Sequence, residues 1–206
     1  MTHPLISASR RFVCGLLAAV VVLALYGCAS AKPATRYYLL NAQPTSEVRD
    51  ACAVRLGAVR LPAYLQRNNI VLLAGDYEIV PALQHRWAEP LADGVERVLR
   101  SCLAASADHA AELNIETLHG EEAGDTVLET EVVLRDDAGA VDARAGLRFA
   151  LTRRDAGYDA LVRSHADVLL ELCQALCALP AELAEARASR GDDPGPIRKR
   201  IERRED

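Results

Sequence analysis

Residues 126–152 read TVLETEVVLRDDAGAVDARAGLRFALT, and this stretch decides the fold class of the chain. Apolar and polar side chains alternate with period two on both sides of a turn at residues 136–139. Such alternation is typical of paired strands that are buried on one face only. The apolar positions are Leu128, Val132, Leu134, Ala145, Leu147, Phe149 and Leu151. The stretch therefore predicts an antiparallel pair of strands whose second face stays polar.

Shorter strand patterns precede this pair, and a turn at residues 74–76 joins two of them as a hairpin. They cover residues 36–40, 54–61, 69–73, 77–80 and 113–116. Two segments show helical spacing of apolar residues. The first begins at Pro90, whose fixed φ suits the first position of a helix. The second runs from Tyr158 to about Leu179, where Pro180 interrupts or bends it. We expect an α+β fold with a single domain, in which two main amphipathic helices pack on one face of an antiparallel (mixed) β-sheet.

The N-terminal segment resembles a secretory signal that ends at a lipid-attachment cysteine. Arg10 and Arg11 precede an apolar run over residues 12–26, which is too short to span a bilayer comfortably, and Gly27-Cys28 follows. Lipoprotein processing needs a small residue before the cut and a thiol after it. The sequence predicts a signal peptide over residues 1–27, a lipidated tether over 28–35, an α+β domain over 36–186 and a disordered charged tail over 187–206. An ordinary signal peptide, with Cys28 incidental, is the alternative.

Acylation of Cys28 determines where the mature chain resides. Each buried CH₂ group contributes about 0.8 kcal/mol, so two or three chains such as palmitate anchor a protein essentially permanently. Ala29 follows the cysteine, whereas Asp at this position marks bacterial lipoproteins for the inner membrane. We therefore expect an anchor at the periplasmic face of the outer membrane of a Gram-negative bacterium.

Composition and motifs argue against several classes of function. A net charge of −5 with 26% charged and 50% hydrophobic residues excludes a strongly basic nucleic-acid binder, a disordered acidic chain and a polytopic membrane protein. The sequence contains no G-x-S-x-G, H-E-x-x-H, Walker A or G-x-G-x-x-G motif, no C-x-x-C pair and no histidines at ligand spacing. His165, on the apolar face of the last helix, is expected to be a core histidine. We predict no catalytic residue, no metal and no cofactor other than the covalent lipid.

Four cysteines remain after Cys14 leaves with the signal peptide and Cys28 takes up lipid, and they allow three pairings. Cys173 and Cys177 lie one helical turn apart, where a disulfide would have to distort the helix. We favour a bond between Cys52 and Cys102. Free buried thiols are an equally weighted alternative for the helical pair.

Three residues near the first helix are interpreted as fold determinants. Trp87 is the only tryptophan and is expected to pack as a staple over the first turn. Glu89 near the N-terminus complements the helix dipole by about 0.5 kcal/mol, and Pro90 begins the helix.

Two stretches, LGAVRLPAYLQRNNIV at residues 56–71 and HRWAEPL at 85–91, together with Tyr37-Tyr38-Leu39-Leu40, resemble the PqiC-like (YmbA) family of ABC-type transport auxiliary lipoproteins. Asn68-Asn69 departs from that family, where a proline is often seen. The resemblance implies a non-enzymatic subunit of an MCE-type intermembrane lipid transport system that serves membrane integrity. It implies a homo-oligomer at the outer membrane, whose partners are a periplasm-spanning MCE-domain protein and its inner-membrane permease.

The loop between the two motifs is our candidate docking site for that partner, through Pro62, Tyr64, Leu65, Arg67 and Ile70. An alternative of equal weight is that Tyr64 and Leu65 tuck into the core beneath an exposed Arg67. Two other functions remain open: a structural or assembly lipoprotein of another envelope machine, and an anchored hydrolase, for which the sequence nominates no residue.

Overall fold

The computed structural model describes residues 33–42, 44, 52–122, 124–153, 155–190 and 197–203. The chain divides into two units, Met1–Ala34 and Thr35–Asp206, and every helix and strand described here belongs to the second. The expected signal peptide, Cys28 and most of the tether lie outside the described residues. Among those that are described, no helix is both long and apolar enough to cross a membrane.

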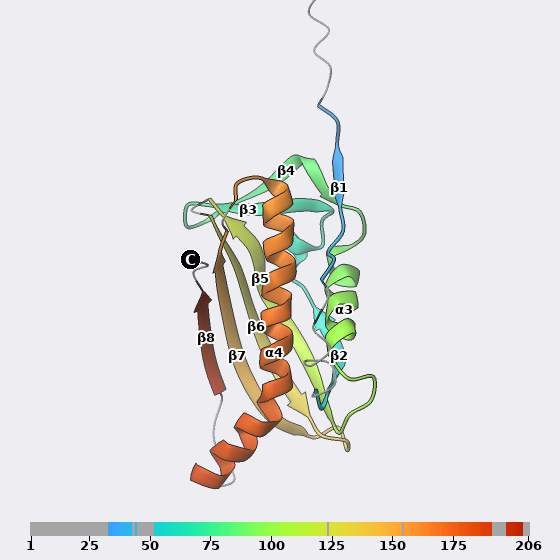
Figure 1. The fold of residues 1–206 in the computed structure, drawn as a ribbon, viewed down its shortest axis with the longest axis vertical. Coiled ribbons are helices and arrows are strands. Elements are labelled where there is room, and N and C mark those ends of the chain that lie inside the picture. Colours follow the sequence, from blue (N-terminus) through green and yellow to red (C-terminus); the bar gives the residue numbers. More distant parts are fainter. Residues whose placement is uncertain are drawn as a thin grey trace, which may run out of the picture. The chain divides into compact units, whose positions relative to one another are not determined.

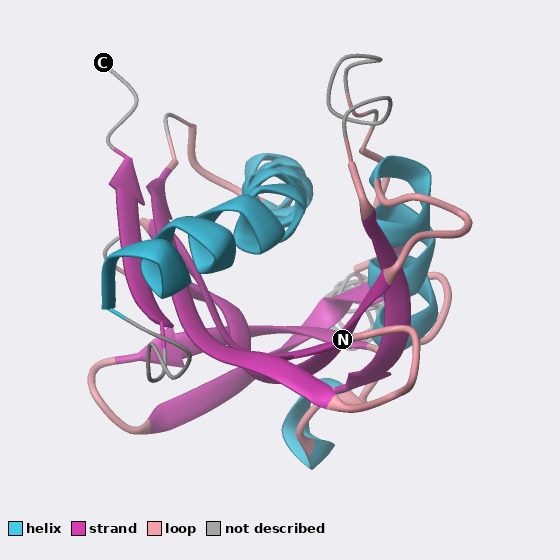
Figure 2. Cartoon of the chain, turned by 90° about the horizontal axis from the view of Figure 1, so that it is seen from below, coloured by secondary structure: helices cyan, strands magenta, loops and turns pink. Residues whose placement is uncertain are grey.

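One mixed sheet forms the centre of the second unit, and both long helices cover the same face of it (Figures 1 and 2). The strand order is β1-β4-β3-β5-β6-β7-β8, and β2 also pairs with β5. The strands are β1 (Arg36–Tyr38), β2 (Val54–Arg60), β3 (Asn69–Ala74), β4 (Glu78–Trp87), β5 (His109–Glu121), β6 (Asp125–Arg135), β7 (Val141–Thr152) and β8 (Ile197–Arg203). The helices are α3 (Leu91–Cys102), α4 (Tyr158–Arg190) and the short 3-10 helix η1 (Ala63–Leu65). The predicted α+β class is confirmed.

The pairing directions divide the sheet into an antiparallel centre and parallel additions. β3 with β4 and β6 with β7 are antiparallel, as the turns at residues 74–76 and 136–139 predict, and β5 with β6 is antiparallel as well. β1 with β4, β2 with β5, β3 with β5, and β7 with β8 are parallel. The parallel pairs join strands that are distant in sequence, so no local turn signals them.

The core lies between the sheet and the two helices. Alternate residues of β6 and β7, such as Leu128 and Phe149, are fully buried there together with Leu161, Leu169 and Leu172 of α4. Trp87 ends β4 and is also buried, and its indole meets the His165 ring of α4 edge to face at 5.6 Å. These contacts bind strands from both halves of the sheet to α4.

α3 begins one residue later than expected. Pro90 has φ −53° and ψ 131°, which is extended backbone, so it precedes the helix and Leu91 is the first helical residue. Glu89 forms an ion pair with Arg97, which lies two turns further along the helix. The acidic side chain therefore contacts a specific partner in addition to lying near the helix N-terminus.

Of the two expected effects of Pro180, interruption near Leu179 is wrong, because α4 continues through Pro180 to Arg190. Leu179 and Leu183 are both buried, so packing on either side holds the helix where proline removes one hydrogen bond. Figure 1 shows α4 bending toward its C-terminal end, which is the distortion that an internal proline produces.

The expected disordered tail over residues 187–206 is also wrong in part. Residues 187–190 belong to α4, and β8 pairs in parallel with β7 over residues 197–203. Lys199 of β8 reaches Glu182 of α4, with Nζ to Oε1 at 2.7 Å. The charged composition of this segment suggested a solvated, disordered tail. Pairing with β7 and the ion pair with α4 instead hold residues 197–203 as a strand.

The expected Cys52–Cys102 bond is wrong, since the disulfides are Cys52–Cys177 and Cys102–Cys173. The Cα atoms lie 4.8 and 6.2 Å apart, within the ordinary range for disulfides. Cys173 and Cys177 share one side of α4, and each finds its partner on a different element instead of on its own helix. One bond fixes α4 to the segment before β2, and the other fixes it to the end of α3.

Candidate functional site

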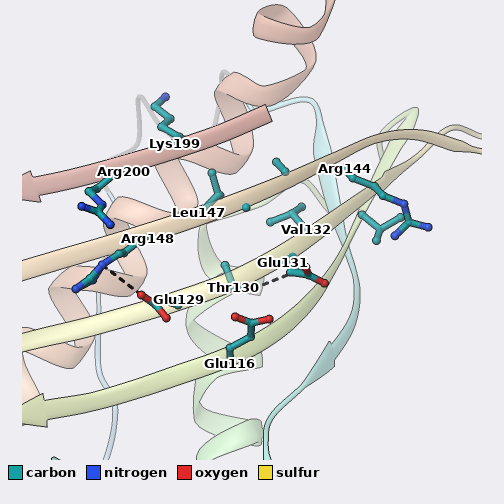
Figure 3. Close-up of a pocket in the computed structure, with 13 residues that line it drawn as sticks. Glu116, Glu129, Thr130, Glu131, Val132, Arg144, Leu147, Arg148, Lys199 and Arg200 are labelled. Atoms are coloured by element: carbon teal, nitrogen blue, oxygen red, sulfur yellow. Dashed lines mark hydrogen bonds and ion pairs between the residues drawn. The ribbon is translucent and has the colours of Figure 1, made fainter. Parts of the chain in front are cut away.

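The face of the sheet that α3 and α4 leave uncovered is hollowed into a concavity. Its volume is about 480 Å³, and its walls come from β5, β6, β7 and β8 (Figure 3). The cross-strand pairs on this open face are Glu129 with Arg148, Glu131 with Gly146, and Val133 with Arg144. The polar half of the alternating pattern in residues 126–152 therefore builds this surface.

Charge is segregated across the strands of the open face. The carboxylates Glu116, Glu129 and Glu131 lie on β5 and β6, whereas the guanidinium groups Arg144, Arg148 and Arg200 lie on β7 and β8. One ion pair joins the two rows, with Arg148 Nε at 3.2 Å from Glu129 Oε1. Among the described residues, Glu116 and Glu131 form no ion pair. The surface is thus bipolar, and a complementary charge pattern on a partner would favour one orientation of binding.

Gly146 lies on the floor of this concavity, opposite Glu131. A Cβ atom built there meets nothing within 4 Å, and the backbone requires no positive φ at this position. A glycine inside a strand weakens it and often marks a place where another group approaches the backbone closely. Gly146 therefore leaves the centre of the open face accessible.

The loop containing η1 lies beside the open face, on the opposite side of the sheet from α3 and α4 (Figure 2). The Tyr64 hydroxyl donates to the carbonyl oxygen of Glu116 at 3.3 Å, and Gln66 Nε2 donates to the Leu61 carbonyl at 3.0 Å. Burial raises the pKa of Tyr64. The Tyr64 bond holds the loop against β5, next to the acidic row, and the Gln66 bond lies within the loop.

Two residues of the expected docking loop cannot contact a partner. Leu65 and Ile70 are fully buried, because the 3-10 turn directs Leu65 inward and Ile70 belongs to β3. Pro62 and Tyr64 are half-buried and Arg67 is exposed. The structure therefore supports the core alternative for Leu65, and it leaves Pro62, Tyr64 and Arg67 at the surface.

Two histidines are buried, His119 in β5 and His165 in α4. His165 is almost fully buried, and its Nδ1 lies 2.7 Å from the Leu161 carbonyl oxygen, to which the neutral ring donates. Burial lowers the pKa of His165 to about 4 and also lowers the pKa of His119. Both rings are neutral at pH 7. Within the described residues, no three His, Cys, Asp or Glu side chains gather as metal ligands would.

A cluster that the sequence did not indicate joins β1, β4 and α4. The Tyr38 hydroxyl and His85 Nδ1 are 2.8 Å apart, and the His85 ring stacks on Tyr158 at 3.7 Å between centroids. Arg36 pairs with Asp159 at 3.4 Å, and burial raises the pKa of Tyr38. Only the tertiary pairing of β1 with β4 brings these residues together. The cluster fixes the first strand after the tether to the start of α4.

Comparisons with known proteins agree with this fold. Residues 37–111 match the family model of the ABC-type transport auxiliary lipoprotein component, a range that includes both quoted motifs. The chain resembles a crystal structure of an uncharacterised protein with a TM-score of 0.60 and 21% identity, covering 71% of this chain and 99% of that one.

A second crystal structure, of a DUF330 protein from Xanthomonas campestris, has a TM-score of 0.59 and 14% identity, covering 75% of this chain and 99% of that one. These two likenesses establish the fold alone. No curated protein sequence matches the chain. Over β1 to the start of β5, residues 37–111, the chain is therefore similar to the ABC-type transport auxiliary lipoproteins.

Proposed function

We propose that the chain is a non-enzymatic outer-membrane lipoprotein subunit of an MCE-type intermembrane lipid transport system. Its acylated Cys28 holds it at the membrane, and its domain receives the periplasm-spanning MCE protein. The observation that carries the proposal is the family match over residues 37–111, which contains the motifs at 56–71 and 85–91. The two disulfides support an extracytoplasmic location, because such bonds persist in an oxidising compartment.

The open face is our proposed docking surface for the MCE protein, with Pro62, Tyr64 and Arg67 at its edge. Segregated charges favour a single binding orientation and accelerate association. Gly146 leaves room at the centre, where an approaching strand or loop would otherwise meet a side chain. A rigid domain suits this role, since the disulfides fix α4 behind the same sheet.

Site-specific photo-crosslinking in cells tests the docking surface. A crosslinking residue placed at Glu131 or at Arg67 is expected to capture an MCE-domain protein of the host cell. The matched control is Arg163, which is exposed on α4 away from the open face. Capture of a different envelope protein would favour the structural or assembly role, and absence of the MCE protein from every position would contradict the proposal.

Density-gradient fractionation of membranes tests the anchor separately. Cys28→Ser is expected to release the protein from the outer-membrane fraction or to leave it unprocessed, because no thiol remains to take up lipid. Cys14→Ser, in the expected signal peptide, is the control and should leave fractionation unchanged. Outer-membrane recovery of the Cys28→Ser protein at the original level would reject the lipid anchor.

A further inference from the structure

Exposed apolar side chains are concentrated at one end of the domain. Six large apolar residues are exposed among the residues that the structure describes, and five of them lie on or beside β1 and β4. These five are Tyr37 (65% exposed), Leu39 (55%), Tyr77 (93%), Val80 (38%) and Leu83 (76%). We call them the apolar end. Val141, at the start of β7, is the sixth.

Strand pairing explains why the apolar end is a single region. β1 pairs with β4, with Tyr37 opposite Arg86, and Tyr77 lies in the turn that joins β3 to β4. The register between β3 and β4 shifts between Asn69 and Val71, so the part of β4 that contains Leu83 bulges out of the ladder. Figure 1 shows β1 and β4 at one end of the sheet and the turn between β6 and β7 at the other.

The covalent tether keeps this same end close to the lipid. β1 begins at Arg36, and seven residues, Ala29 to Thr35, separate it from Cys28. Seven extended residues span at most about 24 Å. By contrast, the 13 residues of β5 alone, which runs between the two ends, span about 43 Å. The tether therefore lets the apolar end reach a bilayer readily, whereas the far end reaches it only if the domain lies flat.

We infer that the apolar end rests on the lipid surface that holds the anchor, with Tyr77 and Leu83 in the headgroup region. This inference rests on the proposed acylation of Cys28. Tyrosine favours the membrane interface because its ring is apolar and its hydroxyl stays hydrated. Acyl chains fix where the protein is, whereas a second, weaker contact fixes how the domain is oriented on the surface. In this orientation the open face is presented sideways, at a constant height above the bilayer.

Fluorescence quenching in vesicles tests the inference with the full-length lipoprotein. Protein extracted from membranes is reconstituted into vesicles of phosphatidylethanolamine and phosphatidylglycerol that carry brominated acyl chains. Leu83→Trp places a reporter at the apolar end, and Val141→Trp is the matched control at the far end. Trp87 is buried and contributes the same background to both variants. We expect the added fluorescence of Leu83→Trp to be quenched at least twofold more than that of Val141→Trp.

The outcomes separate this inference from the proposed function. Flotation of both variants with the vesicles, together with equal quenching, would overturn the membrane contact and leave the anchor intact. Failure to float would overturn the anchor and this inference with it. The fluorescence of the tryptophan in Leu83→Trp could instead change with protein concentration and not with the bromine content of the lipid. That result would overturn the membrane contact, because it would show that a second copy covers the apolar end. Adding Tyr77→Asp to Leu83→Trp should restore fluorescence while flotation persists, and no change on adding it would overturn the contribution of Tyr77.

Discussion

The two faces of the β6–β7 pair differ in chemistry, although both are formed by the same two strands. Successive side chains along each strand point to opposite faces. Toward α4, Leu128 lies opposite Phe149, and both side chains are fully buried. One residue further along each strand, Glu129 lies opposite Arg148 on the open face, where both side chains are partly exposed. The covered face supplies the free energy of folding, whereas the open face is available for recognition. Substitutions on the two faces should therefore affect different measurements.

Phe149→Ala should cause the largest loss of stability. Removing a fully buried phenylalanine costs about 3–5 kcal/mol, because apolar contacts are lost and a cavity remains. Arg148→Ala, at the next residue, should cost no more than about 1 kcal/mol, because its ion pair is partly exposed. Urea unfolding followed by Trp87 fluorescence measures both. Equal losses would show that the open face also contributes to the core.

The disulfides should stabilise the covered face next most strongly. Replacing Cys102 and Cys173 together with alanine should cost about 2–4 kcal/mol, since the unfolded chain loses a crosslink that spans 71 residues. The same change at Cys52 and Cys177 should cost a similar amount. Mass spectrometry of unreduced peptides checks the connectivity directly. A peptide linking Cys52 to Cys102 would contradict the arrangement of α4.

Lowering the pH should reduce the free energy of unfolding through His165, which is buried under the covered face. Its pKa is about 4 in the folded state, where burial excludes the charged form, and about 6.5 when the chain is unfolded. Between these values the unfolded chain binds the proton and the folded chain does not, so stability falls as pH falls below about 6.5. The loss from this group should reach about 2 kcal/mol by pH 5.

Urea midpoints at pH 7 and pH 5 measure this effect. His165→Gln should reduce the difference between the two midpoints, and a residual slope is expected from His119, whose pKa burial also lowers. An unchanged slope in His165→Gln would assign the acid sensitivity to other groups.

Local sequence patterns predicted those parts of the fold that local physics determines. Period-two alternation located β6 and β7, and helical spacing located α3 and most of α4. The prediction failed where a distant contact decides the outcome. β8 is ordered by pairing with β7, and Cys173 and Cys177 each bond to another element. The open face was visible as polar residues at alternate positions, but only the register showed that acidic and basic side chains form separate rows.

One glycine on each face allows a direct comparison of the two faces, because its substitution by alanine adds a single methyl group. A Cβ at Gly120 would lie 2.5 Å from Leu161 Cδ1 and 2.9 Å from Leu72 Cδ2, whereas a Cβ at Gly146 meets nothing within 4 Å. Gly120→Ala should therefore cost about 1–2 kcal/mol through overpacking. Gly146→Ala should leave stability unchanged or raise it slightly, because glycine is unfavourable inside a strand. Thermal unfolding measures both variants. A lower melting temperature for Gly146→Ala than for Gly120→Ala would contradict the assignment of the two glycines to opposite faces of the sheet.

The smallest effect on stability belongs to the ion pair between Glu129 and Arg148, and it separates folding from recognition. Because both side chains are about one-third exposed, the pair should contribute only about 0.5 kcal/mol. Glu129→Arg should lose this amount, and adding Arg148→Glu should restore it by forming the reversed pair.

Docking should respond differently to the same substitutions. If the partner recognises which row is acidic and which is basic, crosslinking from position 131 should fall in Glu129→Arg. It should also stay low in the double variant, although the free energy of unfolding of that variant shows that its domain is intact. Recovery of both properties together would mean that the ion pair acts only within the fold, and that the partner binds elsewhere on the domain.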